Sequence, residues 1–178
     1  MFTDAERRAV LELARAAVRA QVGGGPPPDA AIVLLPAATG AFVTLKRHGQ
    51  LRGCLGTLEC RRSLAEEVAR CAASAARDDP RFAPVGAAEL ADLHVEVSIL
   101  GPLEAIDPFD PAAIVIGRHG LVVERVRHRG LLLPQVATEW GWTREEFLAY
   151  TCRKAGLPGD AWQHGAAVYR FEAEVFAG

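Results

Sequence analysis

One thiol flanked by glycines marks the segment of this sequence best suited to chemistry. Cys54 follows Gly53 and precedes Gly56, and Arg52 stands two residues before the thiol. Residues two apart in a strand share a face, so Arg52 and Cys54 are expected to point the same way. A guanidinium beside a thiol favours the nucleophilic thiolate, and nearby glycine N–H groups could stabilise an oxyanion. The segment thus predicts a nucleophile or covalent carrier; the alternative is a small buried hydrophobic residue in a hairpin.

A second set of polar side chains lies on one face of a predicted strand. His94, Glu96 and Ser98 alternate with valine and isoleucine, so they should face away from the apolar residues. If this strand lay close to Cys54, Glu96 and Ser98 could supply a base and a hydrogen-bond donor. A solvated sheet face shows the same alternation, so both interpretations stay open.

Two further positions could contact a ligand, and one pair should fix a loop. His119 lies between glycines near a predicted hairpin tip, and Gln135 follows a proline, where it could bind a ligand or stabilise a turn. Asp79 and Arg81 are expected to form a local ion pair. The histidines lack metal-ligand spacing and no phosphate-loop motif is present, so the sequence predicts neither a resident metal nor another cofactor.

The composition limits the classes of function. The chain has 178 residues, of which 50% are hydrophobic and 24% charged, as is typical of a globular protein. A net charge of −2 argues against a general attraction to nucleic acid or anionic lipid. No apolar run reaches the roughly 18 residues of a membrane span, and the N-terminus lacks signal-peptide features. The sequence therefore predicts a cytoplasmic protein with reduced thiols.

Helices and strands are interspersed along the chain. Capping boxes predict helices that begin after Thr3, Ser63 and Thr143, and a short helix should follow Pro134. The predicted strands are 41–46 and 51–55, joined by a turn at His48-Gly49; 94–100; 114–116 and 121–126, as a second hairpin; and 168–176. A further turn is expected at 128–130. Hairpins between adjacent strands favour an α+β fold, with a mainly antiparallel sheet flanked by helices.

Several motifs, in order, resemble those of the AMMECR domain family. They are Arg52-Gly53-Cys54-Leu55-Gly56-Thr57-Leu58-Glu59, Asp79-Pro80-Arg81-Phe82, Val95-Glu96-Val97-Ser98, His119-Gly120-Leu121 and Leu133-Pro134-Gln135-Val136. The similarity covers nearly the whole chain after residue 3. It implies one domain over residues 1–178, with a larger lobe built on an antiparallel sheet, a smaller lobe, and the cysteine motif near a cleft between them.

The same resemblance implies a pathway more than a reaction. Microbial members of the family are associated with a Memo-like protein and a radical S-adenosylmethionine protein, which implies an AmmeMemoRadiSam-type pathway. One hypothesis is an enzyme that uses Cys54 with Arg52 and Glu96. Its small-molecule ligand would then be held by Gly53, Gly56, Ser98, His119 and Gln135. A second hypothesis is a non-catalytic binding or scaffold partner of those two proteins. A third is RNA binding, against which the acidic net charge and the lack of a basic-aromatic stripe count.

Overall fold

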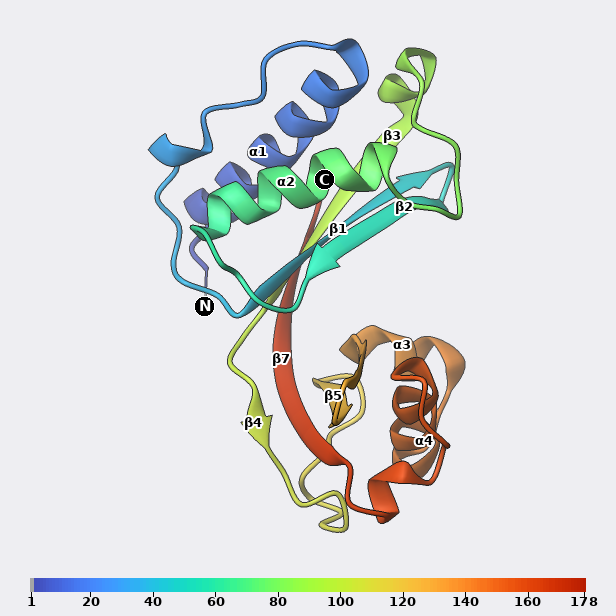
Figure 1. The fold of residues 1–178 in the computed structure, drawn as a ribbon. Coiled ribbons are helices and arrows are strands. Elements are labelled where there is room, and N and C mark those ends of the chain that lie inside the picture. The colour runs from blue at the N-terminus through green and yellow to red at the C-terminus, as the bar shows by residue number, and fades with distance from the viewer. Residues whose placement is uncertain (1) are drawn as a thin grey trace. The chain divides into compact units, whose positions relative to one another are not determined.

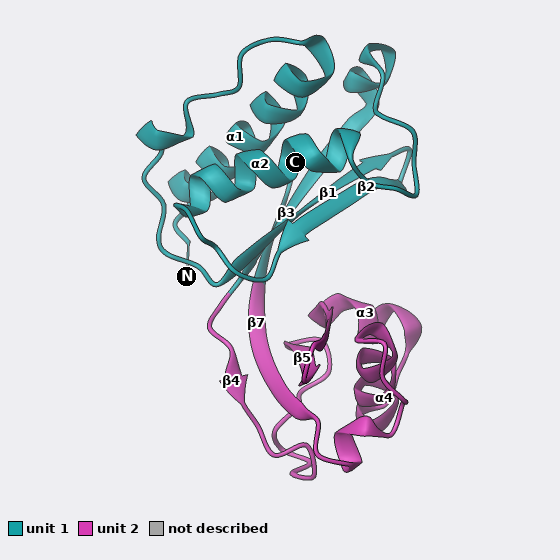
Figure 2. Cartoon of the chain, viewed as in Figure 1, with its two compact units in different colours: residues 1–100, 174–178 teal, residues 101–173 magenta. Residues whose placement is uncertain are grey.

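The computed structural model describes residues 2–178, and the chain divides into two compact units (Figure 2). Unit 1 comprises residues up to 100 together with 174–178, and unit 2 comprises residues 101–173. The last strand, β7 (Ala167–Ala177), contributes residues to both units. Helices and antiparallel strands occur in each unit, which confirms the predicted α+β class.

Unit 1 is built on the antiparallel strands β1 (Gly40–Arg47), β2 (Gln50–Thr57) and β3 (Leu93–Leu100), with β1 in the centre. The end of β7 joins β3 through reciprocal hydrogen bonds between Val95 and Gly178. The predicted hairpin turn at His48-Gly49 is confirmed. Both residues have a positive φ, 51° and 77°, as a two-residue turn of the type favoured in hairpins requires.

Two helices, α1 (Asp4–Gly23) and α2 (Leu64–Arg77), cover one face of this sheet (Figure 1). Both begin at the predicted capping boxes. Val43, Val95 and Val97 are buried on the covered face, in a core that the two helices share with the sheet. Side chains at alternate positions therefore lie on the opposite face, which these helices leave uncovered.

Gly53 brings α2 close to the strand that carries Cys54. A Cβ at Gly53 would lie 2.2 Å from the backbone oxygen of Ala75, in α2. No side chain fits there, because the obstacle is backbone that cannot rotate away. Gly53 therefore faces the helix, and the residue after it faces the uncovered side.

Unit 2 combines β5 (His119–Arg125), β6 (His128–Leu132), the two-residue β4 (Glu104–Ala105) and most of β7. All of its strand pairs are antiparallel among the described residues, and β7 lies between β4 and β5. Two helices complete the unit. They are α3 (Pro134–Trp140) and α4 (Arg144–Lys154), the latter starting at the predicted Thr143 capping box. Residues 2–178 also contain three short 3₁₀ helices: η1 (Ala30–Ile32), η2 (Ala87–Asp92) and η3 (Ala161–Gln163).

Two sequence predictions in unit 2 are wrong. Residues 114–116 form no strand: the Val115 carbonyl accepts hydrogen bonds from the N–H groups of Arg118 and His119, which closes a turn. The second hairpin instead joins β5 to β6, with its turn at Val126-Arg127 and not at 128–130. Gly130 lies within β6 because its missing Cβ leaves room for the end of α4, 2.3 Å from that position.

Candidate functional site

Cys54 lies half-buried on the uncovered face of the unit 1 sheet, with a defined partner for both its thiol and its backbone. The Thr44 hydroxyl, on β1, donates to Cys54 Sγ at 3.2 Å. The Cys54 backbone N–H donates to Oδ2 of Asp79 at 2.9 Å. The sulfur thus has a hydrogen-bond donor beside it, and its strand is tied to the loop that follows α2.

Asp79 is the buried centre of this arrangement, with a side chain only 3% exposed. The Arg81 side chain binds both of its carboxylate oxygens, at 3.0 and 2.7 Å, and the Arg81 N–H donates at 3.0 Å. The Arg81 hydrogen bonds hold the pKa of Asp79 well below its usual range, against the opposing effect of burial, and the Cys54 N–H adds to them. The predicted Asp79–Arg81 ion pair is confirmed.

Arg81 carries a positive charge close to the Cys54 backbone. The hydrogen bond to Asp79 raises the pKa of Arg81, against the effect of burial, and the charges of Asp79 and Cys54 raise it further. Arg81 Nη2 and the Cys54 N–H donate to the same oxygen of Asp79, at 2.7 and 2.9 Å, so the guanidinium lies near the Cys54 backbone. Its side chain is 55% exposed, so part of the cation remains open to an incoming anion.

Arg52 was expected to lie beside the Cys54 thiol, but its hydrogen-bond partners are other groups. Its guanidinium donates to both carboxylate oxygens of Glu89, at 2.8 and 2.9 Å. It also donates to the carbonyls of Ala83 and Pro84, at 2.9 and 3.3 Å. Hydrogen bonds from Arg52, and then from the Gly86 N–H, lower the pKa of Glu89 to about 2. Arg52 thus fastens the loop before η2 to the sheet.

The Phe82 ring connects the two arginines. The guanidinium carbon of Arg52 lies 6.0 Å from the centroid of this ring, and that of Arg81 lies 5.5 Å from it. Cation–π contacts of this kind hold a partly exposed loop in one conformation. The loop from Asp79 to Pro84 is therefore held at both ends and in its middle.

Glu96 lies in the same cross-strand row as Cys54, with Thr44 between them. The register pairs Thr44 with Cys54 on one side and with Glu96 on the other. Strands lie about 4.8 Å apart, so the two outer backbone positions are about 10 Å apart, too far for a direct hydrogen bond in this structure. The Glu96 carboxylate pairs instead with Lys46 Nζ at 3.0 Å.

Thr44 is the site residue that sequence reasoning missed. A regular register outward from the His48-Gly49 turn would have placed Gly53 opposite Thr44. A bulge between Leu45 and Lys46 shifts the pairing by one residue and brings Cys54 there instead. The sequence carries no clear mark of that bulge.

The predicted ligand-binding residues of unit 1 serve mainly in packing. Gly56 lies under the Phe42 ring, because a Cβ there would be 2.3 Å from a ring carbon. Ser98 is paired with Phe42 on the other side and is 1% exposed. Together with Gly53, which faces α2, these residues support the strands that carry Cys54 and Thr44.

His119 and Gln135 belong to unit 2. His119 is buried, and its Nδ1 accepts a hydrogen bond from the Val115 N–H at 3.0 Å. Burial lowers the pKa of His119, and the nearby charges of Arg170 and Arg118 lower it further. Gln135 is half-buried at the second position of α3, and within residues 2–178 its side chain has no hydrogen-bond partner.

The other three cysteines have raised pKa values. Burial raises the pKa of Cys71 to about 11, and also raises the pKa of Cys60 and of Cys152. A thiol with a raised pKa is mostly protonated at neutral pH and therefore unreactive. Among residues 2–178, no three histidine, cysteine or acidic side chains are grouped as a metal site would need. Every helix in that range is too short or too polar to cross a lipid bilayer.

Comparison with known proteins identifies the family. The AMMECR1 family profile matches residues 11–176. The chain belongs to the AMMECR1 family. A protein of Methanothermobacter thermautotrophicus is 47% identical over 179 residues, covering 96% of this chain and 93% of its own length. A protein of Thermococcus onnurineus is also 47% identical, over 94% of this chain and 87% of its own.

A solved AMMECR1-like structure confirms the fold. The crystal structure of a protein from Pyrococcus horikoshii, titled as uncharacterized, is 42% identical. It matches with a TM-score of 0.87 over 98% of this chain and 92% of its own. The predicted family and the α+β fold are therefore both confirmed.

The Arg52–Glu89 pair predicts an acid-dependent contribution to stability. The folded pKa of Glu89, about 2, lies below the ordinary value of about 4.3. The pair therefore contributes fully above about pH 4 and is lost as the pH falls toward 2. We expect Glu89→Gln to lower the free energy of unfolding by about 1–3 kcal/mol at pH 7, with a smaller deficit at lower pH. Urea unfolding, monitored by circular dichroism, measures the free energy of unfolding at pH 7 and at lower pH.

Glu145→Gln is the matched control, because Glu145 pairs with Arg144 at 2.9 Å but is 59% exposed. An exposed pair contributes little, so this variant should unfold like the wild type at each pH. A Glu89→Gln deficit that stays constant from pH 7 to the acid range would contradict the argument.

Proposed function

We propose that this chain is a thiol-dependent enzyme in which Cys54 attacks a small anionic electrophile. One observation carries the proposal: the Arg81 guanidinium and the Cys54 backbone N–H share an oxygen of the buried Asp79, and the half-buried thiol accepts a hydrogen bond from Thr44. The hydrogen bond from Thr44 orients the sulfur, and the partly exposed guanidinium can attract an anionic substrate. Family membership supports a place in an AmmeMemoRadiSam-type pathway, and reduced thiols fit a cytoplasmic location.

Each group has a defined task in this chemistry. The exposed part of Arg81 binds an anionic group of the substrate, carboxylate or phosphate, and directs the adjacent electrophilic carbon toward Cys54 Sγ. The sulfur forms a bond to that carbon, and the leaving group departs with its electron pair. The Thr44 hydroxyl stabilises the charged sulfur before attack. Water or a second acceptor then displaces the thiol and completes the transfer.

Glu96 has a positioning role in this proposal. Its carboxylate holds Lys46 at 3.0 Å on the same face of the sheet, and the Lys46 side chain is 41% exposed. A larger anionic substrate can therefore meet a second cation on β1, the strand next to that of Cys54. Glu96 acts on the substrate through Lys46 and not as a base on the thiol.

The charge beside the thiol can be measured with two alkylating reagents of different charge. Iodoacetate is anionic and iodoacetamide neutral, so the ratio of their rates at Cys54 reports the local cation. We expect Arg81→Gln to lower this ratio by about threefold or more, because a unit charge a few ångströms away contributes about 1 kcal/mol. Peptide mass spectrometry identifies the alkylated cysteine. Arg81→Lys should retain most of the ratio.

An unchanged ratio in Arg81→Gln would show that Arg81 does not act on Cys54. Equal labelling of Cys54 and Cys60 in the native protein would equally count against a special reactivity of Cys54. Arg8→Gln serves as the control, since Arg8 is an exposed cation on α1, away from the sheet face.

Replacement of the thiol separates catalysis from binding. In a strain that lacks the chromosomal copy, Cys54→Ala should fail to restore the pathway product, while Cys60→Ala should restore it. Product levels are measured by mass spectrometry of cell extracts, and immunoblots check that both variants accumulate. Full restoration by Cys54→Ala would instead indicate the alternative function, a non-catalytic binding or scaffold partner of the Memo-like and radical S-adenosylmethionine proteins.

A further inference from the structure

Unit 2 carries a stack of exposed aromatic rings that the proposed thiol chemistry does not use. Trp140 at the end of α3 stacks on Trp142, with ring centroids 6.2 Å apart and planes 16° apart. Trp142 stacks on Tyr150 of α4 at 4.1 Å and 7°. The Arg153 guanidinium lies over the other end of the stack, 4.9 Å from the Tyr150 centroid. Trp140 is 71% exposed, so a large aromatic surface remains open to solvent.

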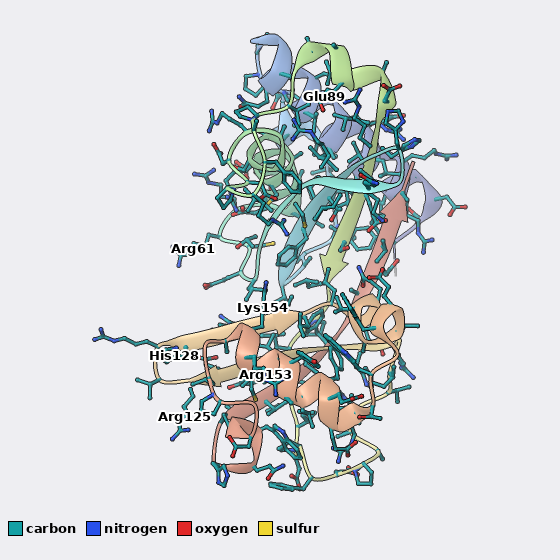
Figure 3. The ribbon with its side chains drawn as sticks, turned by 90° about the vertical axis from the view of Figure 1, so that its right-hand side faces the viewer. Arg61, Glu89, Arg125, His128, Arg153 and Lys154 are labelled. Carbon is teal, nitrogen blue, oxygen red and sulfur yellow. The ribbon has the colours of Figure 1, made fainter. Side chains whose placement is uncertain are left out.

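Next to this stack lie cationic side chains that form no ion pair within the described part of the chain. Arg153 and Lys154 end α4, and the β5–β6 turn adds Arg125 and Arg127; all four side chains are exposed. Within residues 2–178 none of the four forms an ion pair. Figure 3 labels Arg125, Arg153 and Lys154, which lie on the same side of this unit.

The contacts make the stack and the cations one continuous surface. Ala155 follows Lys154 directly, and its carbonyl lies 3.2 Å from the Nδ1 atom of His128 on the β5–β6 hairpin. Gly130 on the same hairpin approaches the backbone of Ala155 so closely that it has no room for a Cβ. The end of α4 is thus fixed against the hairpin, beside its cationic turn. We call the surface formed by Trp140, Trp142, Tyr150, Arg153, Lys154 and the 125–129 turn the basic-aromatic strip.

The hairpin turn has a strained and exposed tip. Val126 lies between Arg125 and Arg127, is 91% exposed, and has a positive φ of 57°. A β-branched residue is a true outlier in this conformation, and such strain concentrates at sites of function. The strain presents an apolar side chain between two cations and so supports a contact surface at the turn.

We propose that the basic-aromatic strip binds single-stranded nucleic acid. Unpaired bases stack on exposed aromatic rings, while phosphates bind Lys and Arg, and this combination is the usual basis of binding without sequence preference. A duplex hides its base faces and would leave Trp140 unused. An acidic protein could form ion pairs with the cations, but its carboxylates would not stack on the exposed ring of Trp140. Nearby acidic groups are occupied or few: Glu124 is 3.9 Å from Arg129, Asp160 pairs with His164 at 3.4 Å, and Glu139 adjoins Trp140.

This proposal differs from the expectation drawn from the net charge. The net charge of −2 averages over the whole chain, whereas the strip gathers cations from segments that lie apart in sequence. The strip lies entirely in unit 2, whereas Cys54 lies in unit 1, and the proposal uses no residue of the thiol site.

The test uses the full chain and a fluorescein-labelled oligouridine about 12 nucleotides long, at about 50 mM salt. Fluorescence anisotropy measures affinity, and quenching of tryptophan emission reports stacking. We expect Arg125→Glu with Arg127→Glu to weaken binding about tenfold or more, and added salt to weaken it further. Trp140→Ala should weaken binding about fivefold and remove most of the quenching, while Trp140→Phe should retain binding.

Two controls are matched to these variants. Arg8→Glu reverses an exposed cation of α1 and should leave the affinity unchanged, as should Cys54→Ala. Absence of binding by the wild type, or equal affinity for a duplex of the same length, would overturn the proposal. A third outcome would also overturn it: polyglutamate or polyphosphate competes equally for binding, and Trp140→Ala does not weaken binding. The strip would then recognise negative charge alone.

Discussion

The Asp79 carboxylate is the contact on which the arrangement around Cys54 depends. It is buried after the end of α2 and binds the backbone of β2 and the side chain of Arg81 at once. Removal of this side chain would leave the Cys54 N–H without its acceptor, and an unsatisfied buried group is costly. One carboxylate therefore fixes the loop after α2, the strand that carries the thiol, and the Arg81 guanidinium.

The rest of unit 1 supports this contact from two sides. Gly53 lets α2 approach β2 closely, which brings the loop after α2 to the Cys54 backbone. Arg52 binds Glu89 and the carbonyls of Ala83 and Pro84, which holds the far end of the same loop. The residues before Cys54 in the motif thus have a structural role. Arg52 and Gly53 position the loop, and the thiol faces the open side of the sheet.

Local patterns in the sequence predicted the elements well. Three capping boxes located the starts of three helices, because each involves residues within one turn. The strand alternation and the His48-Gly49 turn were equally readable. The errors arose where contacts between distant residues decide: Gly130 is a strand residue because Ala155 packs on it, and a bulge moves Cys54 opposite Thr44. Arg52 likewise binds Glu89, 37 residues further along the chain, which spacing could not reveal.

The backbone amide proton of Cys54 offers the most direct test of the central claim, because it is hydrogen-bonded to Asp79. Its chemical shift in NMR spectra should follow the ionisation of that carboxyl. Since the Arg81 hydrogen bonds hold the pKa of Asp79 well below its usual range, the shift should stay constant from pH 7 down to about pH 3. A transition centred near pH 4, as for an ordinary aspartate, would contradict the account.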